Sequence, residues 1–529
     1  MGNACVAAAV TGTARAPAVA DALALEPQEN AMPFDPQAPA TGPMPVYQER
    51  GDQGYKKSLG NFQIQMIGIG GAIGVGLFLG IGGRLAVAGP ALILSYLVVS
   101  AVVYLLMRAL GELVIHRPTT GAWVSYAREF VSDRFAFMTG WIYVALSAVA
   151  GVGEIAALAV YVQFWWPEIP GWIPSLVAAM VIVGCNLLSV KLYGFIETWA
   201  AAIKVVAILL FLGAGIILVA AGDIFNAPTA ASVSNLWNQG FATHGVMVLV
   251  VVMTGVVFSF SAIEIVGVSA GEAKDPEESM PKAINSVVLR IAIFYIGSIL
   301  VLSMLLPTDE YSGEESPFVT ALSSLNIPAL AGIMNFVVLT AAVSGVNATL
   351  YACVRLLRNL AAHGQAPAIM STVSHRGVPS GALVCIFGFD LVGIVMIYAL
   401  GAADAFEVVL SACSVFILFG WISIFVSHLG YRRQVARGQV QPVHFKMPGA
   451  PVTNYVCLTF LVVLSLYIMF DFSNPHWYFS LLAGVLILVA TNVGYEISKR
   501  HVARHGLPEL KTTGTDDHED AEPAQTEGR

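Results

Sequence analysis

Long apolar segments recur along almost the whole of this 529-residue chain, and no other feature constrains its fold as strongly. A helix needs about 20 mostly apolar residues to cross a membrane. The first two segments run together, and we divide them at Gly89-Pro90 because proline cannot continue the hydrogen-bond ladder of a helix. The pattern predicts an all-α membrane protein of about twelve transmembrane helices. Their expected ranges are 62–88, 90–113, 137–163, 172–192, 197–221, 242–270, 284–306, 328–360, 379–400, 402–430, 452–472 and 476–498.

The composition agrees with lipid as the surrounding solvent. Hydrophobic residues make up 57% of the chain and charged residues only 11%, whereas a soluble domain is roughly 25% charged. We expect one membrane domain over residues 56–500, with cytoplasmic tails over 1–55 and 501–529. The first tail is rich in Ala and Pro, and the second is acidic beyond Lys511. Both compositions are typical of disordered segments.

Several classes of partner and function find no support in the sequence. The six cysteines form no CxxC pair, so neither a metal site nor a disulfide framework is expected. No basic surface interleaved with aromatic residues suits nucleic acid. The sequence shows no nucleophile–base pair that would indicate an enzyme. We therefore expect no cofactor, no metal and no catalysis, with membrane lipid around the chain and the oligomeric state left open.

Lys and Arg are distributed unevenly among the predicted loops. The loops 164–171, 222–241, 307–327 and 471–475 contain neither residue, whereas the alternate loops contain several. Loops rich in Lys and Arg stay in the cytoplasm. Both termini are therefore expected in the cytoplasm, and the protein in the plasma (bacterial inner) membrane. Arg84 is the one basic residue expected on the outer side.

The segment 119–136 is too polar to cross the membrane. Trp123, Tyr126 and Phe130 are spaced so that they would share one face of an amphipathic helix at the inner membrane surface. A plain cytoplasmic loop is the alternative.

The first predicted span contains six glycines between Gly68 and Gly80. Glycine weakens a helix by up to ~1 kcal/mol relative to alanine, so we expect the helix to unwind around Ala72–Gly76. The freed N–H groups and the N-terminus of the second half-helix would suit a carboxylate. Close helix packing through small residues is the alternative.

The sixth predicted span carries hydroxyl groups and an acid in the run from Phe258 to Glu264. An acid costs roughly 2.5–3.5 kcal/mol at a membrane centre, so Glu264 should face protein or water. Interrupted helices in matching positions are typical of inverted-repeat transporters, which bind substrate at the repeat interface. The first and sixth spans lie five helices apart, so together they favour a substrate site between them.

Two further ionisable residues lie within predicted spans. Glu154 in the third span is expected to face a cavity, because intramembrane charge is rarely placed elsewhere. Lys204 lies in the fifth span. A buried lysine can exchange a proton near neutral pH. Snorkelling of Lys204 to the inner interface is the alternative.

Several motifs resemble the amino acid permease family of the amino acid–polyamine–organocation superfamily. They are the stretch from Ala88-Gly89-Pro90 through Gly111-Glu112 to Pro118, the run Gly70–Phe78, and the run Phe258–Glu264 followed by Gly271–Pro276. The similarity covers about residues 55–500. It implies a LeuT-like core of two inverted five-helix repeats, helices 1–5 and 6–10, with two further C-terminal helices. It also implies proton-coupled symport of an amino acid.

Within the family, the chain resembles the branch of bacterial L-asparagine permeases. The stretches that carry this resemblance are 110–118, 283–290, 316–320 and 445–451. The chain departs from this branch at Glu154, where the branch tends to carry Asp. The run Glu154–Trp172 is more similar to aromatic amino acid permeases. The expected function is L-asparagine:proton symport. Permeases for aromatic amino acids or for D-serine, alanine or glycine stay open, as does a transporter-like amino acid sensor.

The resemblance also implies roles for individual residues. Backbone N–H groups at Val75 and Gly76 would hold the substrate carboxylate, and carbonyls near Ala72, Phe258 and Ser261 would hold its ammonium group. Lys204 matches a helix-five lysine that occupies a sodium position of related transporters. The expected substrate-binding residues are Ala72, Gly74, Val75, Gly76, Glu154, Phe258, Ser259, Ser261 and Glu264, and the expected proton-coupling residues are Lys204 and Glu154.

Overall fold

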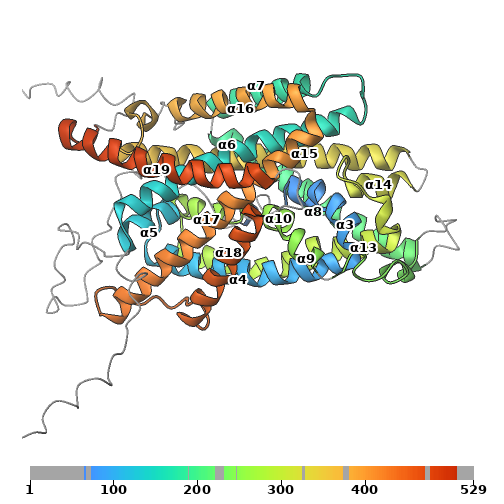
Figure 1. Cartoon of the computed structure of the whole chain (residues 1–529), viewed down its shortest axis with the longest axis horizontal. Helices are drawn as coiled ribbons and strands as arrows, with labels where there is room; N and C mark the ends of the chain where they lie inside the picture. Colours follow the sequence, from blue (N-terminus) through green and yellow to red (C-terminus); the bar gives the residue numbers. More distant parts are fainter. Residues whose placement is uncertain are drawn as a thin grey trace, which may run out of the picture. The chain divides into compact units, whose positions relative to one another are not determined.

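The computed structural model describes residues 65–66, 73–188, 190–220, 231–245, 247–324, 328–372, 380–470 and 477–508. All of them belong to one compact unit, Val46–Arg529. The expected N-terminal tail and the C-terminal tail beyond residue 508 lie outside the described residues, as do Gly68, Gly70, Gly71 and Ala72. Every regular element of the described residues is helical (Figure 1). The predicted all-α fold is therefore confirmed.

The helices follow one another with short connections. Element η6 is a π-helix and the other η elements are 3-10 helices. The elements are α2 (Val75–Phe78), α3 (Gly80–Ala88), η3 (Gly89–Ala91), α4 (Leu92–His116), α5 (Ala122–Phe130), α6 (Asp133–Gln163), α7 (Trp172–Leu188), α8 (Val190–Ala220), η4 (Val233–Leu236), α9 (Val248–Val251), α10 (Met253–Ser259), α11 (Ile265–Ser269), η5 (Ala270–Glu272), α12 (Pro276–Arg290), η6 (Ile291–Gly297), α13 (Ser298–Leu305), η7 (Thr308–Glu310), α14 (Pro317–Ser323), α15 (Pro328–Ala362), η8 (Ala368–Ser371), α16 (Ser380–Leu400), α17 (Ala402–Ala436), α18 (Val452–Met469) and α19 (Trp477–His505).

The helices match the predicted spans one by one. Within the described residues, nine helices are long and apolar enough to cross a membrane, and two shorter apolar helices, Trp172–Asn186 and Val248–Ser259, lie at the fourth and sixth predicted spans. The first of the nine, Gly80–His116, covers parts of the first two predictions. Its two parts are divided at Gly89, whose φ of +63° favours glycine. The division at Gly89-Pro90 is therefore confirmed.

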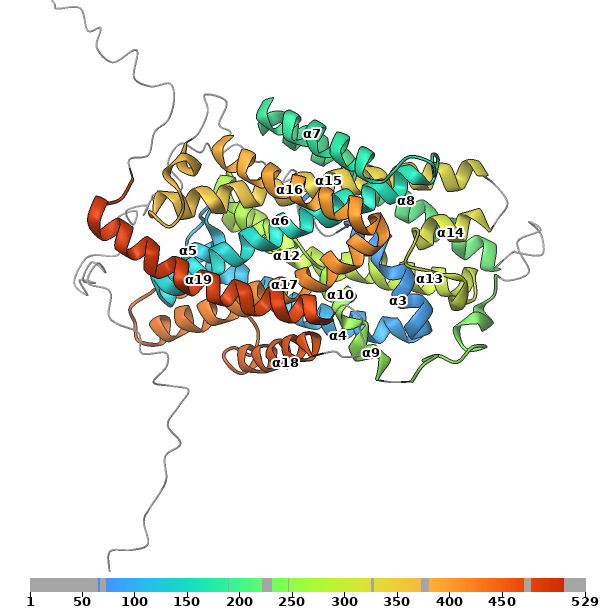
Figure 2. The ribbon, with the colours of Figure 1, turned by 45° about the horizontal axis from the view of Figure 1, so that its top comes forward.

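Helices α6 and α17 form the centre of the bundle. In α6 the most apolar stretch is 89% buried inside the protein, and in α17 it is 78% buried. The same measure is only 28% for α18 and 17% for α19. Helix α6 packs against α15, α17, α7, α16 and α19. The last two helices thus lie at the periphery, as expected for additions to a ten-helix core (Figure 2).

The segment 119–136 contains a helix, so the loop alternative is wrong. Helix α5 buries Trp123, Tyr126 and Phe130 completely or nearly so, and it packs against α6 and α17 rather than presenting this face to lipid. On its other side, Glu129 accepts a 2.9 Å hydrogen bond from Arg117 and lies 3.4 Å from His116. Burial raises the pKa of Glu129, but the hydrogen bond from His116 and the charge of Arg117 outweigh it and hold the pKa below its ordinary value.

The two ends of the bundle differ in charge. Figures 1 and 2 place α5 and the C-terminal end of α19 at one end, and α13 and α14 at the other. The first end carries Arg at the flanks of α5 and Lys and Arg in the last turns of α19. In the loop between α13 and α14, by contrast, every charged residue is an acid. Helix α19 continues to His505, beyond the predicted end at 498, and stops at Gly506 with a φ of +76°. Glycine commonly ends a helix in this way.

Candidate functional site

Both spans that the sequence predicts to be broken are broken in the structure. In the first span, Ile73 and Gly74 lie outside any helix and α2 begins at Val75. The non-helical backbone thus falls within the expected range Ala72–Gly76, although Val75 and Gly76 themselves are helical. A single residue, Leu79, separates α2 from α3. In the sixth, α10 ends at Ser259 and α11 begins at Ile265. The intervening Ala262 has a φ of +68°, which is uncommon for a residue with a Cβ and marks a strained turn.

The two broken spans touch at Gly76 and Ser259. A Cβ on Gly76 would lie 2.6 Å from Ser259 Cα and 3.2 Å from Phe258 O, well inside the usual carbon–carbon contact of about 3.5–4.0 Å. Ser259 Oγ lies 2.9 Å from Gly76 O and 2.8 Å from the Tyr96 hydroxyl. Close packing at Gly76 is therefore real, and it occurs together with the break rather than in place of it.

A small cavity of about 20 Å³ lies beside this contact. That volume holds about one water molecule, so an amino acid can enter only after the surrounding groups move apart. Val75 is buried but does not line the cavity, and Ala72 lies outside the described residues. Seven of the nine expected substrate-binding residues line it, namely Gly74, Gly76, Glu154, Phe258, Ser259, Ser261 and Glu264. Tyr143 and Ser147 of α6 and Gly345 and Thr349 of α15 line it as well.

Glu154 and Glu264 bring two carboxylates to this cavity. They are 7% and 3% exposed, and Oε2 of each has no hydrogen-bond partner among the described residues. A Cβ on Gly345 would lie 2.5 Å from Glu154 Cδ, so a larger residue there would push the carboxylate out of its present position. Buried acceptors without a donor are costly. Both oxygens are therefore open to the ammonium or amide hydrogens of a ligand.

Lys204 of α8 points into the protein and ties α8 to the first broken span. Its Nζ donates to Ile73 O at 3.0 Å and to Ser344 Oγ of α15 at 2.8 Å. Ile73 immediately precedes Gly74 of the cavity lining. Lys204 is 0% exposed, so the snorkelling alternative does not describe this structure.

Glu197, at the predicted edge of the fifth span, proves to be the buried counter-charge of Lys204. Its side chain is 1% exposed, and Ser344 Oγ lies 2.8 Å from both of its carboxylate oxygens. Ser344 thus stands between the carboxylate and the ammonium group. Lys204 follows Glu197 by seven residues, which places both side chains on one face of a helix. The seven-residue spacing could have revealed the pair from the sequence. The predicted span begins at residue 197, however, so Glu197 is taken for a residue at the membrane edge, whereas α8 begins at Val190.

Asp390 of α16 is another buried acid, and its neighbours in the sequence are apolar. It is 3% exposed, and its Oδ1 has no hydrogen-bond partner among the described residues. A Cβ on Gly151 of α6 would lie 3.1 Å from this oxygen. Asp390 does not line the cavity between the broken spans, so it is not part of the candidate site.

Comparison with known proteins agrees with this arrangement. The family model described as "Amino acid permease" matches residues 63–507. The chain belongs to the amino acid permease family. It is 43% identical to an L-asparagine permease of Streptomyces coelicolor, over 80% of this chain and 87% of that protein. It is 41% identical to an L-asparagine permease of Escherichia coli, over 83% and 88%, and 42% identical to L-asparagine permease 2 of Mycobacterium bovis, over 88% and 96%.

At the end of the permease that carries α13 and α14, Arg84 and Glu407 form an ion pair. Arg84 Nη1 and Nη2 donate to the two oxygens of Glu407 at 3.1 and 2.9 Å. The pair joins α3 to α17, and the arginine side chain fills the space over Gly255 of α10. Arg84, which departs from the charge pattern of its side, is thus paired rather than free. Its side chain therefore packs against α10, the first half of the sixth span.

The opposite end of the permease contains a more deeply buried ion pair. Arg355 of α15 contacts Glu272 of η5, and both side chains are 4% exposed. Next to them, a Cβ on Gly271 would overlap the backbone at Thr120, which shows how tightly the loop before α5 covers the sixth span. One ion pair thus lies beside α10, in the first half of the sixth span, and the other at η5, where that span ends.

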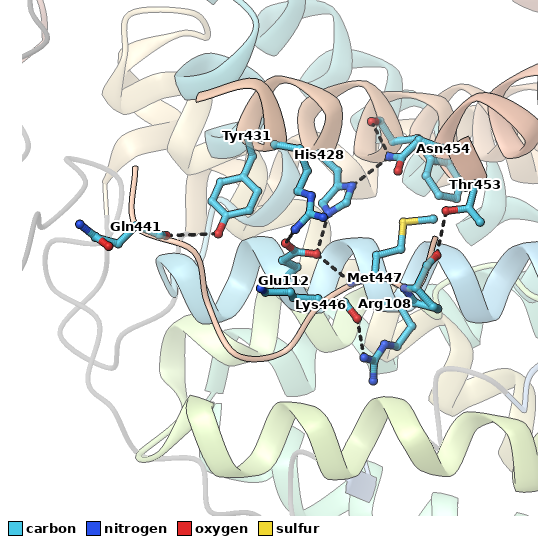
Figure 3. A network of polar contacts seen from close by, with 12 residues as sticks. Arg108, Glu112, His428, Tyr431, Gln441, Lys446, Met447, Thr453 and Asn454 are labelled. Carbon is cyan, nitrogen blue, oxygen red and sulfur yellow. Dashed lines mark hydrogen bonds and ion pairs between the residues drawn. The ribbon is translucent and has the colours of Figure 1, made fainter. Parts of the chain in front are cut away.

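The signature Gly111-Glu112 of the permease organises a polar network next to this end (Figure 3). Glu112 is fully buried, and its carboxylate accepts from His428 at 2.9 Å, from Arg432 at 2.9 Å and from the backbone N–H of Met447 at 2.8 Å. These partners come from α17 and from the loop before α18. Glu112 therefore fixes two segments, α17 and the loop before α18, to α4, and it does not line the cavity.

Proposed function

We propose that this permease takes up L-asparagine together with protons across the bacterial inner (plasma) membrane. The observation that carries the proposal is the cavity between the two broken spans, with an unsatisfied carboxylate oxygen from Glu154 and another from Glu264. Asparagine offers two kinds of donor, an α-ammonium group and a side-chain amide, so it can satisfy two separate acceptors. The names of the relatives, all L-asparagine permeases, support the same substrate.

The substrate backbone is assigned to the two breaks. The N–H groups of Val75 and Gly76 lie in the first turn of α2, where helix N–H groups have no partner within the helix, and they would hold the carboxylate. Carbonyls near Ala72, Phe258 and Ser261 would hold the ammonium group. Gly74 and Ser259 complete this part of the site.

The substrate side chain is assigned to the acids. A carboxylate accepts hydrogen bonds and has none to donate, so it favours the NH₂ of an amide over the carboxylate of an acidic amino acid. Glu154 lies on α6 and Glu264 in the break of the sixth span, on two different walls of the cavity. The pairing of Glu264 with the amide and Glu154 with the ammonium group is one arrangement, and the reverse is the other.

Lys204 is assigned the coupling role, with Glu197 and Ser344 as its supports. When protonated, Lys204 makes charge-assisted bonds to Ile73 O and Ser344 Oγ and holds the first broken span to α8 and α15. When neutral, it loses the charge that strengthens these bonds. Proton occupancy, together with that of Glu154, would thus bias the equilibrium between two arrangements of the broken spans. No sodium requirement is expected.

Uptake by purified protein in proteoliposomes tests the substrate. Radiolabelled L-asparagine should accumulate under an inward proton gradient, and unlabelled competitors should include aromatic amino acids, D-serine, alanine, glycine and aspartate. Strong competition by asparagine alone is expected. If an aromatic amino acid competes more strongly than unlabelled asparagine, the substrate is aromatic and not asparagine. If no amino acid of the panel is taken up, the result favours a sensor.

Two lysine variants test the coupling. Lys204→Met should lose accumulation driven by the proton gradient while some exchange of labelled for unlabelled substrate remains. Removing one partner of a buried ion pair costs roughly 3–5 kcal/mol, so the double variant Lys204→Met/Glu197→Gln, which leaves no buried charge unpaired, serves as the control for folding. Full accumulation by either folded variant would remove Lys204 from the coupling mechanism.

The boundaries and orientation form part of the same proposal. The transmembrane domain is assigned to residues 56–500, with tails over 1–55 and 501–529. Both tails are assigned to the cytoplasm, because the predicted loops rich in Lys and Arg fall on their side of the membrane. The same proposal assigns the chain to transport rather than to catalysis, which the family match supports.

A further inference from the structure

A second, larger cavity lies at the basic end of the permease, away from the broken spans. It is a groove of about 660 Å³ between α19, the first turns of α6, and the turn that follows α15. Volumes of roughly 300–1,000 Å³ are typical of sites for sizeable organic ligands. Its lining includes Phe137, Trp141, Gln365, Ile487, Ala490, Gly494, Ser498, His501 and His505.

The groove is apolar at one end and polar at the other. Along α19 it extends from Ile487 to His505, and these 18 residues correspond to about 27 Å at 1.5 Å per residue. Half of the hydrocarbon core of a bilayer is about 15 Å thick. The groove therefore reaches from the interior of one leaflet to the level of its headgroups, with Ile487 and Ala490 at the deep end and His501 and His505 at the mouth.

Basic side chains lie on α19 next to the mouth of the groove, outside its lining. Lys499, Arg500 and Arg504 are exposed in the last turns of α19, and none of them forms an ion pair with another described residue. The nearest acid on this helix, Glu496, is already paired with Arg134. Among the described residues, these three cations have no counter-charge, and they lie on the same helix turns as the mouth of a groove whose depth is apolar.

We propose that this groove binds an anionic glycerophospholipid from the leaflet at the basic end of the bundle. One acyl chain would lie between α19 and the start of α6, and the phosphate would lie at the mouth beside the cations of α19. Basic pockets between transmembrane helices on the positive side of a membrane bind anionic headgroups. Trp141 lines the groove, and its indole donates to Gln365 O at 2.9 Å.

Charge argues against a second copy of this chain as the occupant. A copy presenting the same face would bring its own three cations against these three, and like charges in contact are unfavourable. A phospholipid, in contrast, matches both the apolar depth and the positive mouth. It would also fill the space beside α19, the least buried of the long helices, and so hold that helix to α6.

Native mass spectrometry and thermal melting of the full-length permease test the proposal. Purified protein is titrated with phosphatidylglycerol and, separately, with phosphatidylcholine of the same chains. One phosphatidylglycerol should stay bound and raise the melting temperature, and phosphatidylcholine should bind far more weakly. In Lys499→Gln/Arg500→Gln/Arg504→Gln the preference should fall by on the order of 100-fold, because three surface cations are removed.

Two further variants separate a built site from general attraction. Ala490→Phe fills the deep end of the groove and should reduce retention of both lipids while leaving the charges intact. Arg433→Gln/Arg437→Gln removes exposed cations at the end of α17 and should change neither retention nor melting. Equal binding of the two lipids by the wild-type protein overturns the proposal. So does an effect of the α17 control as large as that of the α19 variant, or a fatty acid that binds as tightly as phosphatidylglycerol.

Discussion

Replacing Gly76 by alanine tests whether the contact between the broken spans is essential. The added Cβ would lie 2.6 Å from Ser259 Cα and 3.1 Å from Ser259 N, and ordinary carbon contacts are about 3.5–4.0 Å. The two backbones must therefore separate by at least about 1 Å, because neither obstructing atom belongs to a flexible side chain. Overpacking of this kind typically costs about 1–3 kcal/mol, which corresponds to roughly a 5- to 150-fold change in an equilibrium constant.

Gly80→Ala is the matched control. It lies one turn further along the same glycine-rich span, but the nearest atoms to its Cβ would be 3.9 Å away. Both substitutions gain the helix propensity of alanine, up to ~1 kcal/mol, so only the contact differs between them. Initial rates of asparagine uptake, normalised to folded protein, and thermal melting are measured for both. We expect a large loss for Gly76→Ala alone. Wild-type uptake and melting by Gly76→Ala would refute the reasoning.

Four other outcomes follow from the structure. A cysteine at Ser312 should react with an impermeant outside reagent and one at Gln439 should not, and reversed labelling would invert the topology. Glu154→Gln should weaken uptake or shift the competition profile, and an unchanged profile would exclude Glu154 from the pocket. Glu112→Ala should lower the melting temperature sharply, because it strands buried donors at a cost of roughly 3–5 kcal/mol; an unchanged melt would contradict this. Because the pKa of Glu129 is lowered on folding, its ion pair stabilises the protein above about pH 4.5 and is lost as the pH falls further; the melting difference between wild type and Glu129→Gln should shrink accordingly.

The number and order of the helices follow from the sequence because a membrane span has a nearly fixed length in apolar residues. The break at Gly89 and those around Gly76 and Ala262 follow from local chemistry, since proline, clustered glycine and intramembrane polar groups each disfavour a continuous helix. Helix ends were harder to predict. Helix α8 begins at Val190, earlier than expected, and α19 ends later, at His505. A helix can continue past the apolar stretch that reveals it, because its backbone bonds do not depend on the solvent.

What the sequence does not contain is the rotation of each helix about its axis, and the site depends on it. Glu264 and Lys204 are recognisable because a charge amid apolar residues must face inward, but their partners are not. Ser344 is one hydroxyl among many in the chain, and only its position between Glu197 and Lys204 distinguishes it. The Glu197–Lys204 pair also changes the electrostatic argument for coupling. With both groups ionised the network is neutral, so a single proton gained or lost leaves a net charge in the membrane interior. Such a charge is costly, and the broken first span, bonded to Lys204 through Ile73, is the element best placed to respond by moving.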